Sequence, residues 1–402
     1  MLGWLPLSAV ALFAAMPNPE AFRERLVKQG AAPEWLIVPF AADAALSAFA
    51  AQAVGSAPTP QEKVVRLRTA FEQLKRQGAL VLDRDNAPKA RLPRLAADLF
   101  RDTMARAPER QAGCYELSAL FVAAARSVGL EAVGVEREST DAIGQIGHVI
   151  AGIRTTPQAS MLFVDLQNVG ARGGAPLREL SDEEFLAHHL NHLSAAYFLR
   201  GELAAALRAS DGAVFLAPEN PSFLNNRATV LAALGETAIA QAEAAHAVEL
   251  APHVALYRYQ LGRLFLADAR FRDAVPQLAE AVRLAPPYGL ARRDLGYALL
   301  LVGEQTDGHA LLHQTFVDAP QTPDIAWFFA LALVSGGREG EALQVVNGAL
   351  AKAPNDGNLQ ALALLLGRSV QAPADALSRT RSVLQSIARR DHGERGAAPL
   401  GH

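Results

Sequence analysis

The second half of the chain repeats apolar positions with the period of an α-helix, and proline interrupts this pattern at a fixed interval. The prolines lie 34 residues apart, at Pro218, Pro252, Pro286, Pro320 and Pro354. Proline lacks a backbone N–H and keeps the preceding residue out of the helical conformation, so each proline is expected just beyond the end of a helix. The spacing predicts five helical hairpins over residues 187–354.

Small residues recur in the same phase as the prolines. In two units, the first helix has a Leu-Gly pair at the same position, which includes Gly262 and Gly296. Two further positions are usually alanine, and the fourth unit has Gly308 and Thr315 there instead. The recurring alanines are Ala206, Ala240, Ala274 and Ala342 at one position, and Ala213, Ala247, Ala281 and Ala349 at another. This pattern resembles the tetratricopeptide repeat, which implies an all-α superhelix with a concave groove for a protein or peptide.

The register places a mixed set of side chains on the expected groove. They are Asn191, Asn225, Tyr259, Arg263, Arg293, Tyr297 and Trp327. Amide, guanidinium and aromatic groups together suit an extended segment that carries a carboxylate. The alternative is a solvated concave face with a purely architectural role, because a fold alone does not name its ligand.

The pattern weakens after the last proline. Residues 355–391 are expected to form closing helices that shield the last repeat, and residues 392–402 a disordered tail.

At the N-terminal end, residues 1–57 contain an apolar stretch from Trp4 to Met16 that is too short to span a bilayer as a helix. It is typical of a signal-peptide core but lacks a preceding Lys or Arg. Export to the periplasm is slightly favoured, the alternative is a cytoplasmic chain with an ordinary first helix, and membrane contact is expected only if residues 1–16 act as an anchor.

Residues 58–186 show a different pattern. Helical spacing over residues 59–76, 95–105 and 114–129 gives way to three short runs typical of strands, at 131–138, 147–154 and 161–167. A helix followed by antiparallel strands indicates an α+β domain. A length of 402 residues agrees with two domains, because one hydrophobic core rarely organises so long a chain.

Composition argues against some classes of partner and excludes an intramolecular disulfide. The formal net charge of -3 and the absence of long Lys or Arg runs argue against nucleic acid as a partner. The chain has a single cysteine, Cys114, so an intramolecular disulfide is excluded and the position of this residue needs its own explanation.

Cys114 stands where an apolar helical pattern begins. The unpaired N–H groups and dipole of a helix start favour a thiolate. His148 begins the second predicted strand and Asp165 ends the apolar part of the third, so pairing of these strands would bring the two side chains together. A cysteine nucleophile needs an imidazole to take its proton and a carboxylate to orient that imidazole.

This order and spacing resembles the transglutaminase-like (papain-like cysteine) superfamily over about residues 59–180. The matching positions are Gly113, Cys114, Arg126, Ser127, Gly129, His148 and Asp165. The family often follows its histidine with Ala-Trp, whereas this chain has Val149 and Ile150, which puts the substrate contacts near the base in doubt.

The resemblance implies that Cys114 is the nucleophile, His148 the base and Asp165 the orienting group. Asn168 is an alternative orienting residue, and Gln111 is a weak candidate for holding an oxyanion. Each residue also has a structural alternative. Cys114 could be a buried structural cysteine, His148 a strand-end histidine that packs on the sheet, and Asp165 a solvated acid at the end of a strand.

The sequence therefore predicts a cysteine-dependent hydrolase or acyl transferase that acts on peptide or amide bonds of a protein recruited by the repeats. The alternative is a non-catalytic binding scaffold whose cysteine domain is structural. A third hypothesis, a metal-dependent hydrolase, rests on His188, His189 and His192, for which ordinary packing is expected instead. No metal and no cofactor is expected.

Overall fold

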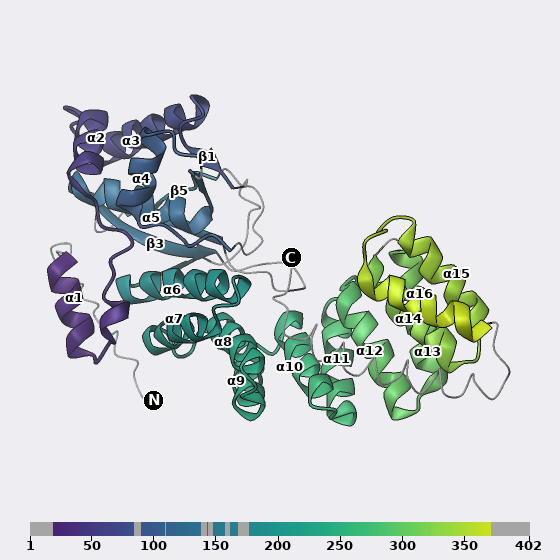
Figure 1. Ribbon diagram of the computed structural model, residues 1–402. Coiled ribbons are helices and arrows are strands. Elements are labelled where there is room, and N and C mark those ends of the chain that lie inside the picture. The colour runs from purple at the N-terminus through teal and green to yellow at the C-terminus, as the bar shows by residue number, and fades with distance from the viewer. Residues whose placement is uncertain are drawn as a thin grey trace, which may run out of the picture. The chain divides into compact units, whose positions relative to one another are not determined.

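The computed structural model describes residues 19–83, 90–108, 110–137, 143, 148–156, 161–167, 177–320 and 322–370 (Figure 1). The chain divides into two compact units. Unit 1 comprises Met1–Asn86, Leu92–Glu138 and Gly147–Leu190, and unit 2 comprises Ala87–Arg91, Ser139–Ile146 and Asn191–His402. The expected signal core, residues 1–16, the second part of the expected closing segment, residues 371–391, and the expected tail, residues 392–402, lie outside the described residues.

Unit 1 begins with a series of short and medium-length helices. They are α1 (Pro19–Lys28), a 3-10 turn (Pro33–Trp35), α2 (Ala44–Val54), α3 (Pro60–Arg76), α4 (Ala96–Met104) and α5 (Cys114–Ser127). The expected start of α3 is confirmed, because the Thr59 side chain accepts a hydrogen bond from the N–H of Glu62 and proline occupies the first helical position. Helix α5 is buried along most of its length, so it forms the core of the unit.

A four-stranded antiparallel sheet packs against α5 in the order β5-β4-β3-β6. Its strands are β3 (Glu131–Arg137), β4 (His148–Arg154), β5 (Leu162–Val164) and β6 (Leu177–Glu179). The three strands predicted from sequence are β3, β4 and β5. The prediction missed β6, whose three residues are all exposed and so carry no apolar alternation.

A second, two-stranded sheet holds the residues just before α5. Strands β1 (Val81–Leu82) and β2 (Gln111–Ala112) run parallel, with Val81 opposite Gln111 and Leu82 opposite Ala112. Two-residue strands show no periodicity, so sequence reasoning gave these residues no strand. Only contacts between distant parts of the chain create this pair.

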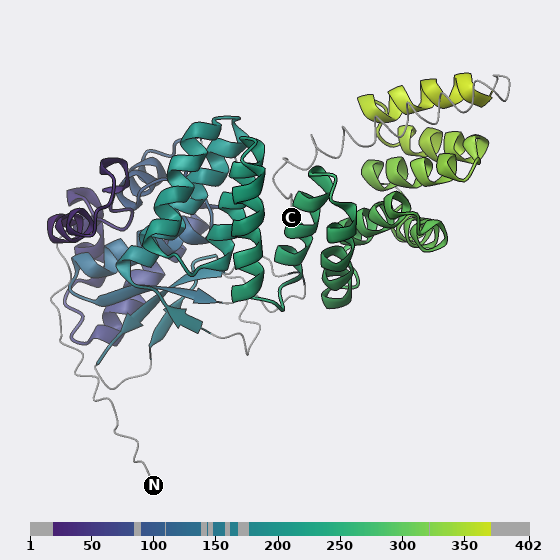
Figure 2. The ribbon, with the colours of Figure 1, turned by 90° about the horizontal axis from the view of Figure 1, so that it is seen from below.

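Helix pairs follow one another through the second half of the chain (Figures 1 and 2). The pairs are α6 (Asp182–Leu199) with α7 (Leu203–Leu216), α8 (Pro221–Ala233) with α9 (Thr237–Leu250), α10 (Ala255–Ala267) with α11 (Phe271–Leu284), α12 (Gly289–Val302) with α13 (Gln305–Asp318), and α14 (Pro323–Ser335) with α15 (Glu339–Leu350). The second helix of each pair ends two to four residues before the recurring proline. The predicted 34-residue helical hairpins are thus confirmed.

Glycines permit the closest helix contacts in unit 2. A Cβ added at Gly296 would lie 2.7 Å from the Leu312 side chain, and one added at Gly308 would lie 2.8 Å from the carbonyl oxygen of Gly296. The usual alanine would therefore collide with backbone at position 308. This explains why the fourth unit departs from the alanine pattern.

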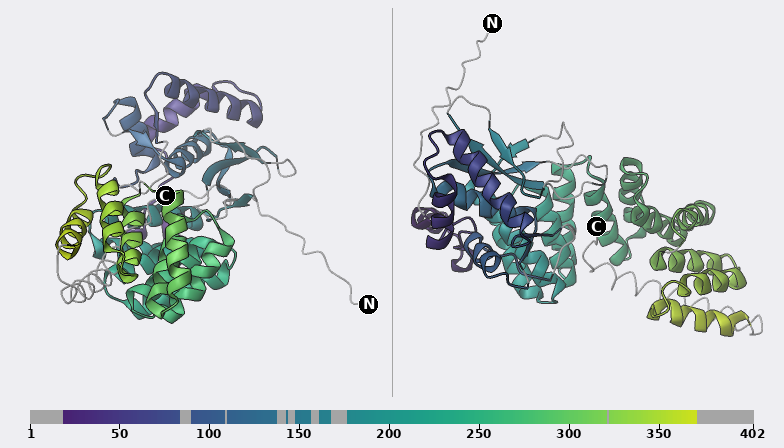
Figure 3. Two further views of the ribbon diagram at one scale, coloured as in Figure 1. Left: turned by 90° about the vertical axis from the view of Figure 1, so that its right-hand side faces the viewer. Right: turned by 90° about the horizontal axis from the view of Figure 1, so that it is seen from above.

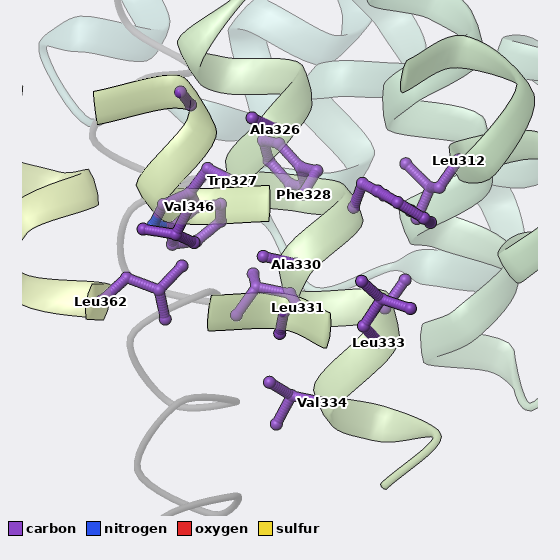
Figure 4. Packing of buried hydrophobic residues seen from close by; sticks show 14 of the residues in the cluster. Leu312, Ala326, Trp327, Phe328, Ala330, Leu331, Leu333, Val334, Val346 and Leu362 are labelled. Atoms are coloured by element: carbon purple, nitrogen blue, oxygen red, sulfur yellow. The ribbon is translucent and has the colours of Figure 1, made fainter. Parts of the chain in front are cut away.

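The last hairpin is covered by α16 (Gly357–Val370), within the segment expected to close the repeats. Two further views show α14, α15 and α16 side by side at the yellow end of the chain (Figure 3). Leu359, Leu362 and Leu366 of α16 join a buried cluster with Trp327 and Val346 (Figure 4). None of the helices among the described residues is long and apolar enough to cross a membrane.

Candidate functional site

Cys114 is the first residue of α5, as the apolar pattern predicted. It is partly exposed, and Gly113 is the N-cap residue of the helix. The hydroxyl oxygen of Ser118 lies 2.8 Å from the carbonyl oxygens of both Cys114 and Val149, so the first turn of α5 is tied to β4. The thiol therefore projects from a fixed helix end beside the strand that begins with His148.

His148 and Asp165 meet as the sequence predicted. The Nε2 atom of His148 lies 3.0 Å from Oδ2 of Asp165, and both side chains are largely buried. His148 opens β4 and Asp165 follows β5, and these strands pair with Ala151 opposite Val164. The Cys114 side chain is also a hydrogen-bond partner of His148. The imidazole thus joins the carboxylate and the thiol.

These contacts set the charge of the pair. Burial alone lowers the pKa of His148, but hydrogen bonds and charges from Asp165 and Cys114 outweigh it and raise the pKa to about 9. Burial pushes the pKa of Asp165 upward, but His148, the N–H of Gln167 and the charge of Arg137 hold it below its ordinary value. An imidazolium and a carboxylate therefore face each other at neutral pH.

Asp165 is held by the turn that follows it. The backbone N–H of Gln167 donates to Asp165 Oδ1 over 2.9 Å, which leaves Oδ2 toward His148. From α3, the ammonium of Lys75 donates to the carbonyl of Leu166 over 2.6 Å. Sequence reasoning missed Gln167 and Lys75, because a backbone hydrogen bond leaves no mark on residue identity. Asn168, the alternative orienting residue, lies outside the described residues.

A charged pair holds the loop before Cys114. Glu116 accepts hydrogen bonds from the N–H of Gly113 over 3.1 Å and from the N–H of Arg94 over 3.0 Å. Arg94 also pairs with Asp102 over 3.2 Å and donates to the carbonyl of Gln111. Gln111 itself is an exposed residue of β2, two residues before Gly113. Its role in holding an oxyanion stays a prediction. A Glu three residues into a helix is the sequence sign that could have revealed Glu116.

Two of the three clustered histidines are buried, and His192 is partly exposed. His188 and His189 are 3% and 2% exposed, and the ring of His189 packs 5.7 Å from that of Tyr115. Burial lowers the pKa of His188, which favours its neutral form. Among the residues that the structure describes, no three His, Cys, Asp or Glu side chains are grouped as a metal site would need.

The seven residues expected in the repeat groove, Asn191, Asn225, Tyr259, Arg263, Arg293, Tyr297 and Trp327, are all less than 9% exposed. Several of these side chains contact other residues of the repeats. Asn191 accepts a hydrogen bond from Asn226 over 2.9 Å, and Arg263 lies 5.5 Å from the ring of Tyr259. Arg293 pairs with Asp294 over 2.6 Å and lies 4.8 Å from the ring of Phe328. Their contact with a ligand stays a prediction.

Comparisons with known proteins concern the repeats. No family model and no curated protein matches the chain. A solved thermophilic TPR protein of Thermus thermophilus, TTC0263, is 25% identical over 45% of this chain and 98% of its own, with a TM-score of 0.41. YrrB, a TPR protein with an unusual peptide-binding site, is 18% identical over 43% of this chain and 90% of its own, with a TM-score of 0.36.

A third solved structure is that of PilW, a type IV pilus biogenesis factor. It is 19% identical over 51% of this chain and 93% of its own, with a TM-score of 0.43. These scores are too low to carry the fold assignment, which rests on the helix pairs and the 34-residue period of the chain itself. The second half of the chain therefore has a tetratricopeptide-like helical repeat fold.

Proposed function

We propose that the helical hairpins of residues 182–350 form a scaffold that binds a protein or peptide. The observation that carries this proposal is the stack of five helical hairpins within residues 182–350, whose prolines recur every 34 residues. Stacked helical repeats form extended concave surfaces, and repeat proteins use such surfaces for binding. Nothing in this proposal requires chemistry at Cys114.

Site-specific photocrosslinking tests the scaffold. A benzoylphenylalanine placed at Asn226, a partly exposed residue on the first helix of the second hairpin that contacts Asn191, should give a discrete adduct with one or a few proteins. The same probe at Ile239, an exposed residue on a second helix, is the matched control. Equal adducts from both positions would contradict a binding face on the first helices.

A second candidate function, cysteine chemistry, is favoured by a different observation. His148 has Asp165 on one side, 3.0 Å away, and the Cys114 thiol as its other partner. This arrangement supports a transglutaminase-like domain in which Cys114 is the nucleophile, His148 moves the proton and Asp165 orients the ring. Peptide or amide hydrolysis and acyl transfer to an amine would use the same three residues.

The proposed reaction has two balanced steps. The Cys114 sulfur attacks an amide carbonyl, and a C–S bond forms while His148 delivers its proton to the departing amine and the C–N bond breaks. Water or a second amine then attacks the acyl-thioester, gives its proton to His148 and releases the thiolate. Backbone N–H groups at the start of α5 would stabilise the oxyanion of each step.

Alkylation by iodoacetamide tests the cysteine proposal without a known substrate. A thiolate paired with imidazolium should react rapidly below pH 7. Reaction of Cys114 only at alkaline pH, in the folded protein, would leave the scaffold as the sole function. The chain has no other cysteine, so the labelled site needs no separation from others.

A further inference from the structure

We infer that Gln167 is a positioning residue for the Cys114 chemistry: it joins the turn that carries Asp165 to the strand that leads into Cys114. The inference rests on the proposed cysteine function and extends it to a residue outside the Cys-His-Asp triad. Gln167 is expected to act through its hydrogen bonds to Asp165 and Asp83.

The first contact sets the orientation of Asp165. The backbone N–H of Gln167 donates to Oδ1 of Asp165 over 2.9 Å, and Oδ2 of the same carboxylate lies 3.0 Å from His148. Both carboxylate oxygens are therefore engaged. A shift of the backbone at Gln167 would turn the carboxylate relative to the imidazole.

The second contact fixes that backbone. The side-chain amide of Gln167 donates to the carbonyl of Asp83 over 2.7 Å, across 84 residues of sequence. The N–H of Asp83 donates in turn to the carbonyl of Ala112 over 2.9 Å. Ala112 ends β2 and lies two residues before Cys114. The Gln167 side chain, through Asp83, therefore links the turn that carries Asp165 to the strand that precedes Cys114.

The residues of this link are buried, so the loss of one of its hydrogen bonds should be costly. Gln167 and Asp83 are each 8% exposed, and Ala112 is 0% exposed. Water has little access to replace a lost hydrogen bond there, so the Asp83 carbonyl would move toward another donor. Misplacement of a reacting group by about 1 Å can lower a rate by about 100-fold.

The test is the pH profile of Cys114 alkylation by iodoacetamide in the full chain with Gln167→Met. Methionine keeps the length of the side chain and removes its donor. We expect the midpoint of alkylation to rise by about one pH unit and the rate at pH 6 to fall about tenfold. The matched control is Gln260→Met, which removes a buried glutamine donor to Thr229 at 2.8 Å and should leave the profile unchanged.

The outcomes separate the inference from the function on which it rests. An unchanged midpoint in Gln167→Met overturns the positioning role, even if the melting temperature falls. If His148→Ala leaves the profile of the parent protein unchanged, the cysteine function itself fails and takes the inference with it. If Gln167→Met does not fold, Gln167→Asn, which keeps the amide but is one methylene shorter, is judged by the same criterion.

Discussion

The two units are stabilised by contacts of different range along the chain. In unit 2, helix pairs next to each other in sequence make the main contacts, such as α10 with α11 and α12 with α13. In unit 1, Arg126 pairs with Asp182 across 56 residues and Lys75 reaches Leu166 across 91. A repeat can therefore be interpreted locally, whereas the candidate site exists only when distant segments meet.

Removal of the Arg126 side chain should lower stability more than any other change proposed here, because it breaks long-range contacts of unit 1. Arg126 and Asp182 pair over 2.6 Å with side chains only 14% and 10% exposed, and Arg126 also donates to the carbonyl of Ala132. We expect Arg126→Ala to lower the free energy of unfolding by about 3 kcal/mol. Urea unfolding of the full chain measures it.

The control for that change is Arg283→Gln in the repeats. Arg283 pairs with Glu280 on the surface, over 2.7 Å, and exposed pairs of this kind contribute little. No measurable change in the free energy of unfolding in urea is expected. Equal effects of the two arginine changes would show that the contrast between the units is wrong.

His148→Ala should slow alkylation of Cys114 at pH 6 by about 100-fold, because positioned imidazoles supply rate effects of this order. Circular dichroism checks that the variant is folded. The repeats should be unaffected, since their contacts lie within unit 2. A rate within twofold of the parent would remove the imidazole from the proposed chemistry.

Gly308→Ala should destabilise the repeats by about 2 kcal/mol, since its Cβ would lie 2.8 Å from the carbonyl oxygen of Gly296. Gly348→Ala is the matched control. Its Cβ would meet nothing within 4 Å, so the gain in helix propensity should stabilise the protein by about 0.5 to 1 kcal/mol. Thermal unfolding with the Cys114 labelling profile as a second readout would show whether the effect stays in unit 2.

The smallest expected effect is a pH dependence of stability. The pKa of His148 is about 9 in the folded protein against 6.5 for an ordinary histidine, so the stabilisation is complete below about pH 6.5 and is lost as pH rises through about 9. We expect parent and His148→Gln to differ by about 1 kcal/mol more at pH 6 than at pH 9.5, allowing for solvent screening.

Asp165 acts at the other end of the pH range. Its pKa lies below the ordinary 3.8, so its contribution is present above about that pH and is lost as pH falls further. Urea unfolding at pH 3, 6 and 9.5 measures both limbs. A difference between parent and His148→Gln that is constant with pH would contradict the pairing of His148 with Asp165.

Much of the fold could be predicted from sequence, and less of the site. The hairpins, the helix that starts at Cys114 and the strands that carry His148 and Asp165 all follow from periodicity and proline spacing. The strands β1 and β2 did not, because they are only two residues long, and β6 did not, because its three residues are all exposed and show no apolar alternation. The hydrogen bonds of Gln167 and Arg94 could not be predicted, because their partners lie elsewhere in the chain.

The sequence by itself determined the 34-residue period, the helix ends at proline and the residue types that could carry cysteine chemistry. These depend on short-range sterics and on the side chains themselves, which the sequence states directly. Only the tertiary structure decided that Gly308 approaches the backbone of Gly296, that the groove residues are buried, and that the Asp165 turn is linked through Asp83 to β2, which precedes Cys114. Such contacts join residues far apart along the chain, and their geometry is fixed only when the whole core packs.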